Sequence, residues 1–357
     1  VGDRGDIYRT SGSKFVIVST ETNQSDMIEL YDEIRDKFRE GVETEGVIHN
    51  LNTYGGYMNI VDKDDRSDRT FYDCLLQSYN ESKQYRHGEL VIYNGNHTGD
   101  PKLSGKIVMI TAIRASLIED FHGFYLLYQP VFKDGGTVPI GAEAVLRWKS
   151  EKYGVVDSED FLPEIEQDYA FERLGDWVIK NALHDAKEFV EVYPDFKLFI
   201  TVTQSQIWAP YFVSNLYELI KSIDLPASSI MIQISKECRM LEMKRIEHFA
   251  ETLRKGDISI GIDDFGRGNA WLKTFSAIHP DYVRISRELV DNLGKSNDDT
   301  TIITGLVNMM HLCGKTVYIK GLDSEEKYKY FKGLPVEGFQ GEFFSEPVYY
   351  DEVLDYY

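Results

Sequence analysis

Cysteine is scarce in this sequence, and the few cysteines that occur are scattered. The chain of 357 residues has only Cys74, Cys238 and Cys313, and none of them forms a CxxC pair. Zinc sites and small secreted domains need clustered cysteines, so neither a zinc ion nor a disulfide framework is expected. A reducing compartment, and with it a cytoplasmic location, is the simpler prediction.

Long apolar runs are also missing. No stretch approaches the roughly 20 residues that a helix needs to cross a bilayer, and no signal peptide is recognisable. Because the chain starts at Val1 and not at a methionine, we expect it to be a fragment. An upstream membrane anchor or sensor stays open.

Positive charge is in short supply. Lys and Arg number 39 against 59 Asp and Glu, which gives a formal net charge of −20. A body this acidic repels a phosphate backbone, so general nucleic-acid binding is not expected. A small phosphorylated ligand stays compatible with the composition wherever cations gather locally.

The remaining composition is that of a globular protein of about two domains, with 42% apolar and 27% charged residues. Alternating apolar residues on both sides of Ser11-Gly12-Ser13 predict a hairpin, and helical spacing marks residues 25–40 and 71–86. The segment 94–101 is rich in Gly, Asn and Pro and is the predicted boundary. We expect a small α/β domain at 1–98, a linker helix within 99–122 and a second domain at 123–357.

From residue 124 onward, short apolar runs alternate with amphipathic helices. The runs are 124–129, 141–148, 198–203, 230–234, 258–262, 282–285, 316–319 and 338–340. About eight runs in ~230 residues indicate a (β/α) barrel, with a doubly wound sheet as the alternative. Polar residues stand late in one run after another, and in a barrel such positions converge on the face where active sites lie. These residues are Thr203, Gln233, Asp263, Arg284, Lys320 and Gln340.

Two adjacent carboxylates, Asp263 and Asp264, follow the apolar run 258–262 and precede Phe265 and Gly266. Carboxylates at the end of a strand suit divalent-metal and phosphate chemistry. The structural alternative is a cap for the following helix, because Asp is a good N-cap residue.

These features resemble the EAL domain family, which is named for a Glu-Ala-Leu signature and hydrolyses the bacterial messenger cyclic di-GMP. The resemblance runs from about Gly123 to Leu354. It rests on an ordered set of motifs: Tyr128-Gln-Pro-Val131, Glu143-Ala-Val-Leu-Arg-Trp148, Phe161-Leu-Pro163, Asp263-Asp-Phe-Gly266 and Phe339-Gln-Gly-Glu-Phe-Phe-Ser-Glu-Pro347. It implies an α/β fold with an EAL-type, TIM-like (β/α) barrel.

Residues 1–98 resemble the C-terminal half of a GGDEF domain, an α+β module that synthesises the same messenger. In the segment that matches the Gly-Gly-Asp-Glu-Phe signature, Ser13 and Lys14 replace both carboxylates. Cyclase activity is therefore not expected, and we interpret the hairpin as a packing or docking element.

The EAL resemblance implies a site for two divalent cations, Mg²⁺ or Mn²⁺, which activate a water molecule and neutralise the scissile phosphate. Of the residues that the family uses there, Glu143, Asp263, Asp264 and Gln340 remain. The others are replaced: Thr203 stands for asparagine, Gln233, Lys236, Lys320 and Asp323 for glutamate, Arg284 for the lysine at the catalytic water, and Ser286 for aspartate.

These replacements remove most of the negative charge of the site. At the matched positions this chain has four carboxylates and three cations, a net charge of −1, which no longer compensates two divalent ions. We therefore expect no metal and no catalysis. We predict that Lys320 or Arg284 occupies the space of a metal and pairs with the aspartates. If a metal binds, Glu143, Asp263 and Asp264 are its expected ligands.

Positions that hold the dinucleotide in the family are better preserved. Gln129, Arg147, Gln340, Phe344 and Pro347 match, while Val145 replaces the signature leucine. A guanidinium suits a pair of phosphate oxygens and a phenyl ring can contact a base. For Arg147, a salt bridge at the barrel mouth is an equal alternative. The loop at 267–271 departs from the family, in which it couples dimerisation to the metal site, and Trp271 is interpreted as a packing residue.

Three functions stay open. The first is a catalytically inactive signalling module that senses cyclic di-GMP through Gln129 and Arg147, docks other signalling proteins or associates with itself. The second is an active phosphodiesterase that uses Mg²⁺ or Mn²⁺ at a reduced site around Glu143, Asp263 and Asp264. The third is a scaffold that binds a partner protein and no nucleotide.

Overall fold

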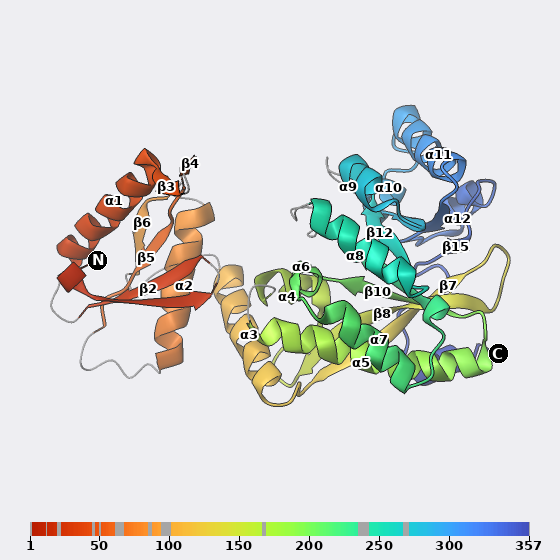
Figure 1. The fold of residues 1–357 in the computed structure, drawn as a ribbon, viewed down its shortest axis with the longest axis horizontal. Helices are drawn as coiled ribbons and strands as arrows, with labels where there is room; N and C mark the ends of the chain where they lie inside the picture. The colour runs from red at the N-terminus through yellow and green to blue at the C-terminus, as the bar shows by residue number, and fades with distance from the viewer. Residues whose placement is uncertain are drawn as a thin grey trace. The chain divides into compact units, whose positions relative to one another are not determined.

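The computed structural model describes residues 2–11, 13–19, 23–44, 47–49, 51–60, 68–84, 88–93, 101–165, 169–234, 243–266 and 271–356. The chain divides into two compact units, Val1–Glu119 and Asp120–Tyr357 (Figure 1). Most of the expected boundary segment, 94–100, lies outside the described residues. None of the described helices combines the length and apolar character needed to cross a bilayer.

The first unit mixes helices with short two-stranded sheets. Its elements are the 3-10 turn η1 (Gly2–Arg4), β1 (Asp6–Ser11), β2 (Lys14–Val18), α1 (Gln24–Glu40), β3 (Val42–Thr44), β4 (Val47–His49), β5 (Gly55–Tyr57), α2 (Asp68–Gln84), β6 (Leu90–Ile92) and α3 (Pro101–Ile118). The predicted hairpin is confirmed, because β1 pairs antiparallel with β2. Helix α1 begins where Asn23 accepts from the backbone of Asp26 and Asp26 reaches back to Asn23, a capping box.

The second unit is a closed eight-stranded barrel, which confirms the predicted fold class. Its strands are β7 (Phe124–Phe132), β8 (Pro139–Ser150), β10 (Lys197–Val202), β11 (Ile230–Ile234), β12 (Ser259–Phe265), β13 (Tyr282–Ile285), β14 (Thr316–Ile319) and β15 (Gly338–Phe339). They follow one another around the ring, and a pairing between β8 and β10 closes it. Strand β7 runs antiparallel to both neighbours, and β9 (Gly154–Asp157) extends the sheet beyond β8.

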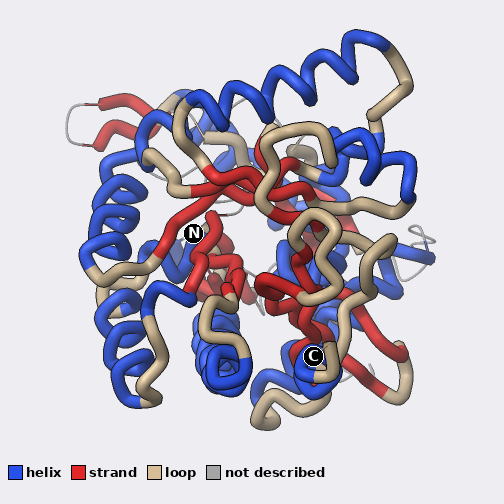
Figure 2. Tube along the Cα trace, turned by 90° about the vertical axis from the view of Figure 1, so that its right-hand side faces the viewer, coloured by secondary structure: helices blue, strands red, loops and turns tan. Residues whose placement is uncertain are grey.

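Helices cover the outside of this ring (Figure 2). They are α4 (Ser158–Ile165), α5 (Tyr169–Val192), α6 (Gln204–Trp208), α7 (Phe212–Ser222), η2 (Ala227–Ser229), α8 (Met243–Lys255), α9 (Trp271–Ile278), α10 (Arg287–Asp291), α11 (Asn297–Leu312), α12 (Glu325–Phe331) and α13 (Tyr350–Leu354). The long helices present one apolar stripe to the strands, as α8 does with Ile246, Phe249, Ala250 and Leu253. In a barrel of this kind, the carboxyl ends of the parallel strands form the face on which site residues gather.

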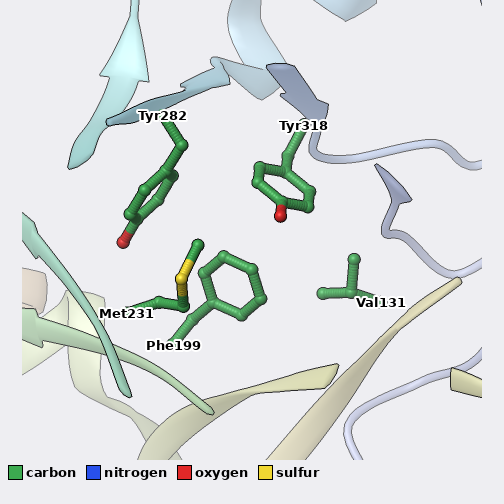
Figure 3. Close-up of a cluster of buried hydrophobic side chains, with 5 residues drawn as sticks. All are labelled: Val131, Phe199, Met231, Tyr282 and Tyr318. Atoms are coloured by element: carbon green, nitrogen blue, oxygen red, sulfur yellow. The ribbon is translucent and has the colours of Figure 1, made fainter. Parts of the chain in front are cut away.

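An apolar layer fills the lower part of the barrel. Val131, Phe199, Met231, Tyr282 and Tyr318 come from five different strands and point toward one another (Figure 3). The three aromatic rings meet edge to face, with centroids 5.1–5.8 Å apart, which is the favoured geometry for such pairs. The layer forms the floor on which the polar residues of the mouth rest.

The seam between β8 and β10 depends on glycine. A Cβ atom at Gly141 would overlap with the carbonyl oxygen of Lys197 on the neighbouring strand. Gly141→Ala is therefore expected to lower the free energy of unfolding by about 1–3 kcal/mol or more, measured by urea denaturation.

Gly305 provides the matched control. It lies in α11, and no atom comes within 4 Å of the position that an alanine Cβ would take there. Gly305→Ala should raise stability by up to about 1 kcal/mol through helix propensity alone. Equal effects at the two positions would contradict this account of the seam.

Candidate functional site

A polar layer lies directly above the apolar floor, one step further along each strand. Because side chains two residues apart in a strand point to the same side, each of the eight strands has one position at the level of the floor, which is a glycine on β8, β12 and β15, and one position above it. The pairs are Gly141 and Glu143, Phe199 and Thr201, Met231 and Gln233, Gly261 and Asp263, Tyr282 and Arg284, Tyr318 and Lys320, Gly338 and Gln340, and, on the antiparallel strand, Val131 and Gln129. The sequence thus places one apolar and one polar layer within the same ring.

Arg284 is the centre of the polar layer. Its guanidinium donates to Glu143 Oε2 at 2.9 Å, to Gln233 Oε1 at 2.9 Å and to Gln340 Oε1. Its Cζ atom also lies 5.2 Å from the ring centroid of Phe199 in the floor. With 1% of its surface exposed, the side chain is fully enclosed, so this charge is stabilised by Glu143 and by the hydrogen bonds around it.

Gln233 connects Arg284 by hydrogen bonds to residues of β8 and β10. Its amide nitrogen donates to Glu143 Oε1 and to Thr201 Oγ1, both at 2.7 Å, while its oxygen accepts from Arg284. A glutamate at this position would place a second carboxylate beside Glu143. The amide instead supplies a donor to one neighbour and an acceptor to the other.

Lys320 lies against the two adjacent aspartates. Its Nζ atom is 2.9 Å from Asp263 Oδ2, 3.1 Å from Asp263 Oδ1 and 3.8 Å from Asp264 Oδ1. Arg284 reaches the same carboxylate at 4.0 Å. Both cations approach Asp263 from neighbouring strands, and of the two residues predicted to pair with the aspartates, Lys320 makes the closer contact.

The charged state of this cluster follows from burial and ion pairing together. Burial alone would raise the pKa of Glu143, but Arg284 and Lys320 lower that pKa to about 2. Burial would lower the pKa of Lys320, but Asp263 and Glu143 raise it above its ordinary value, and the pKa of Arg284 is raised in the same way. Both cations thus stay charged at neutral pH.

Divalent cations do not fit this donor set well. Mg²⁺ and Mn²⁺ prefer several carboxylate oxygens, whereas the carboxylates of Glu143 and Asp263 already bind Arg284 and Lys320. Across the described ranges, no group of three or more His, Cys, Asp and Glu side chains is arranged to hold a metal ion.

The two aspartates are part of a strand, so the helix-cap alternative is wrong. Both lie within β12, and the next described helix, α9, starts only at Trp271. Asp264 has a positive φ of 49°, and the pairing between β12 and β13 shifts register between Ile262 and Phe265. This irregularity turns two successive carboxylates toward the mouth.

Three other residues predicted for the catalytic site make contacts outside this cluster. Thr203 caps α6 and Ser286 caps α10. Asp323 is exposed and pairs with Lys327 at 2.8 Å, while Lys236 lies outside the described residues. Thr201, which the run of late polar residues did not single out, is the threonine that contacts Gln233. Thr201 is two residues after Phe199 in the same strand, so its side chain points to the same side, and this spacing could have identified it.

The predicted ligand residues form two groups at the mouth. Gln340 donates to the backbone oxygen of Gln129 at 3.1 Å, and the Gln129 amide donates to Ser345 O at 3.4 Å. Arg147 forms a salt bridge with Asp157 of β9 at 2.7 Å, and half-buried Val145 lies between Glu143 and Arg147 on the same side of β8. The sequence anticipated an acidic partner for Arg147 but could not name this one.

The closing segment packs by aromatic contacts. The Phe344 ring stacks on Phe132 with centroids 5.5 Å apart and meets Tyr328 edge to face at 5.1 Å. Pro347 is half-buried next to Val348, which exchanges backbone hydrogen bonds with Tyr128. The loop 267–270 and the side chain of Trp271 lie outside what the structure describes.

Comparison with known proteins identifies the fold family. The EAL domain family matches residues 112–347, more than half of the 357 residues. The chain belongs to the EAL domain family. Proteins of this family include cyclic di-GMP phosphodiesterases, which use Mg²⁺ or Mn²⁺ when active.

Individual relatives are distant. PdeI of Escherichia coli K12, a probable cyclic di-GMP phosphodiesterase, is 29% identical over 232 residues, which cover 63% of this chain and 29% of PdeI. The oxygen sensor protein DosP of the same organism is 22% identical over 357 residues, which cover 97% of this chain and 43% of DosP. The chain therefore spans less than half the length of these relatives.

A solved structure shows the same fold. The MucR phosphodiesterase of Pseudomonas aeruginosa, in its complex with cyclic di-GMP, superposes with a TM-score of 0.64 at 20% identity. The superposition covers 69% of this chain and 99% of that one. At this level of identity the likeness concerns the barrel and not the chemistry of its mouth.

Proposed function

We propose that this EAL domain is a signalling module that binds cyclic di-GMP and does not hydrolyse it. The observation that carries the proposal is the contact of Lys320 Nζ with both carboxylate oxygens of Asp263, at 2.9 and 3.1 Å. The residue that the family pattern would use as a metal ligand is bound here to an ammonium group.

Electrostatics supports the loss of metal-dependent chemistry. An ammonium group 4 Å from a divalent cation is repelled by about 8 kcal/mol at an effective dielectric near 20, twice the value for two unit charges. Displacing Lys320 would also leave its charge without Asp263 in a site where only 20% of the lysine side chain is exposed. Metal binding therefore has to overcome both costs.

Retention of ligand-contacting residues supports a receptor. Gln129, Arg147 and Phe344 lie on β7, on β8 and in the closing segment, where the resemblance places contacts to the dinucleotide. The Arg147 guanidinium pairs with Asp157 at 2.7 Å, and a guanidinium fork suits the oxygens of a phosphate. The solved relative MucR is a cyclic di-GMP complex.

We infer that residues 1–98 are a GGDEF-like half-domain without cyclase activity. Strand β1 of the hairpin ends at Ser11 and strand β2 begins at Lys14. The signature of that family would stand at this turn. Neither side chain at positions 13 and 14 is a carboxylate, so this part is proposed to pack or dock signalling proteins.

The test is a hydrolysis assay combined with calorimetry. With Mg²⁺ or Mn²⁺ and prolonged incubation, we expect no linear pGpG from this protein, while an active EAL phosphodiesterase in parallel converts all of its substrate. Titration with cyclic di-GMP should release measurable heat. Release of pGpG that is lost in Asp263→Asn would instead support the alternative of an active enzyme, which the retained Glu143, Asp263 and Asp264 favour. Absence of binding would leave the scaffold role.

A further inference from the structure

Lys320 is the one of the two cations in the polar layer that faces the barrel mouth. Its side chain is 20% exposed, compared with 1% for Arg284. It follows the last residue of β14, Ile319, and its backbone nitrogen still bonds to Ile285 O on β13. A molecule that enters the mouth therefore meets the ammonium of Lys320 before it meets the guanidinium below.

The ammonium group has hydrogen-bonding capacity to spare. A lysine has three N–H donors, and within the described part of the chain its two hydrogen bonds both go to the carboxylate of Asp263. The next carboxylate oxygen, of Asp264, is 3.8 Å away, which is too far for a hydrogen bond. One donor can thus bind a ligand oxygen without breaking the contact with Asp263.

The surrounding charges keep this donor in place. Asp263 is itself enclosed, with 9% of its side chain exposed, and it fixes the ammonium from below. Arg284 contacts Glu143 at 2.9 Å and lies further from Asp263, at 4.0 Å, so Lys320 remains the closer cation to that carboxylate. A charge-assisted hydrogen bond from an oriented lysine to a phosphate oxygen is among the stronger polar contacts.

We propose that Lys320 contacts a non-bridging phosphate oxygen of the bound dinucleotide directly, and that binding consequently needs no divalent cation. The lysine would link Asp263 to the phosphate, with the ammonium between two anionic oxygens. This inference rests on the proposed function, because it assumes that cyclic di-GMP occupies the mouth.

The first test uses the unaltered protein and titrates cyclic di-GMP in EDTA and, separately, in excess Mg²⁺. We expect dissociation constants that agree within about twofold. Binding that is abolished by EDTA and restored by Mg²⁺ would overturn the proposal without any variant having to fold.

The second test compares Lys320→Met with Lys329→Met. Lys329 is 67% exposed and pairs with Glu325 on the surface of α12, so its loss changes the net charge equally but leaves the mouth intact. Loss of a hydrogen bond to a charged group should weaken binding about 10- to 100-fold in Lys320→Met, and Lys320→Arg should retain most of it. Lys329→Met should bind like the unaltered protein. Unchanged or tighter binding by Lys320→Met would mean that the lysine blocks the mouth and would contradict the proposal.

The same samples separate this inference from the proposed function. Linear pGpG in the calorimeter cell would refute the non-hydrolytic function, whatever the variants show. If no pGpG forms, a requirement for Mg²⁺ would refute only the role of Lys320. Unchanged or tighter binding by Lys320→Met would do the same. No heat from the unaltered protein in either buffer would contradict both.

Discussion

Replacement of Arg284 by methionine is expected to lower the free energy of unfolding by about 3–5 kcal/mol, the usual cost of removing one partner of a buried ion pair. The arginine is 1% exposed and donates to Glu143, Gln233 and Gln340. Without it, the Glu143 carboxyl is left in an enclosed site with no cation in direct contact. Urea denaturation followed by circular dichroism measures the change.

Arg287 provides the matched control three residues further on. It also forms a salt bridge, with Glu342 at 2.9 Å, but its side chain is 54% exposed. Arg287→Met should therefore change stability by less than about 1 kcal/mol.

Glu143→Gln in the Arg284→Met background should recover part of the loss, because the charge left without a partner is then gone. If Arg284→Met were as stable as Arg287→Met, the buried network would have no role in holding the barrel together.

Restoring the family's charges at three positions is expected to create a metal site. Gln233→Glu, Arg284→Lys and Lys320→Glu together add carboxylates beside Glu143 and Asp263 and remove the ammonium that contacts the aspartates. Reversal of one unit charge 4 Å from a divalent ion is worth several kcal/mol even at an effective dielectric near 20, so Mn²⁺ should bind at least about 100-fold more tightly than to the unaltered protein. Isothermal titration measures this.

A surface variant controls for charge alone. Lys329→Glu with Asn308→Asp adds the same negative charge at two exposed helical positions. It should leave Mn²⁺ binding unchanged, since charges beyond a Debye length are screened. If the triple variant folds and still fails to bind Mn²⁺, the residues at positions 233, 284 and 320 would not be the reason for the poor fit.

The barrel could be predicted from the sequence because seven of its eight strands are largely apolar runs of four or more residues that alternate with helices. The elements that the sequence did not reveal are short. Strand β9 has four residues and pairs only with the extended end of β8. Helices α6 and α10 have five residues each, too few for a helical period to show. The antiparallel direction of β7 depends on tertiary pairing that no local pattern records.

The sequence could predict most of the residues that lie at the site, but only some of the contacts between them. The position of Lys320 followed from polar residues late in successive strands, since parallel strands bring their ends to one face. The partner of Arg284 could not be predicted from the sequence, because the choice between Glu143 and the aspartates depends on how far the side chain reaches across the ring. Thr203 was assigned to the site from its position after β10, whereas a hydroxyl before a helix start also makes a good cap, and here the cap is what forms.

Anomalous diffraction from crystals grown with excess Mn²⁺ and cyclic di-GMP tests the central claim most directly. We expect no manganese peak within bonding distance of Asp263 and Asp264, with the Lys320 ammonium in density against Asp263 and toward a phosphate oxygen. A pair of manganese peaks bridged by the two aspartates, with Lys320 displaced, would contradict the account.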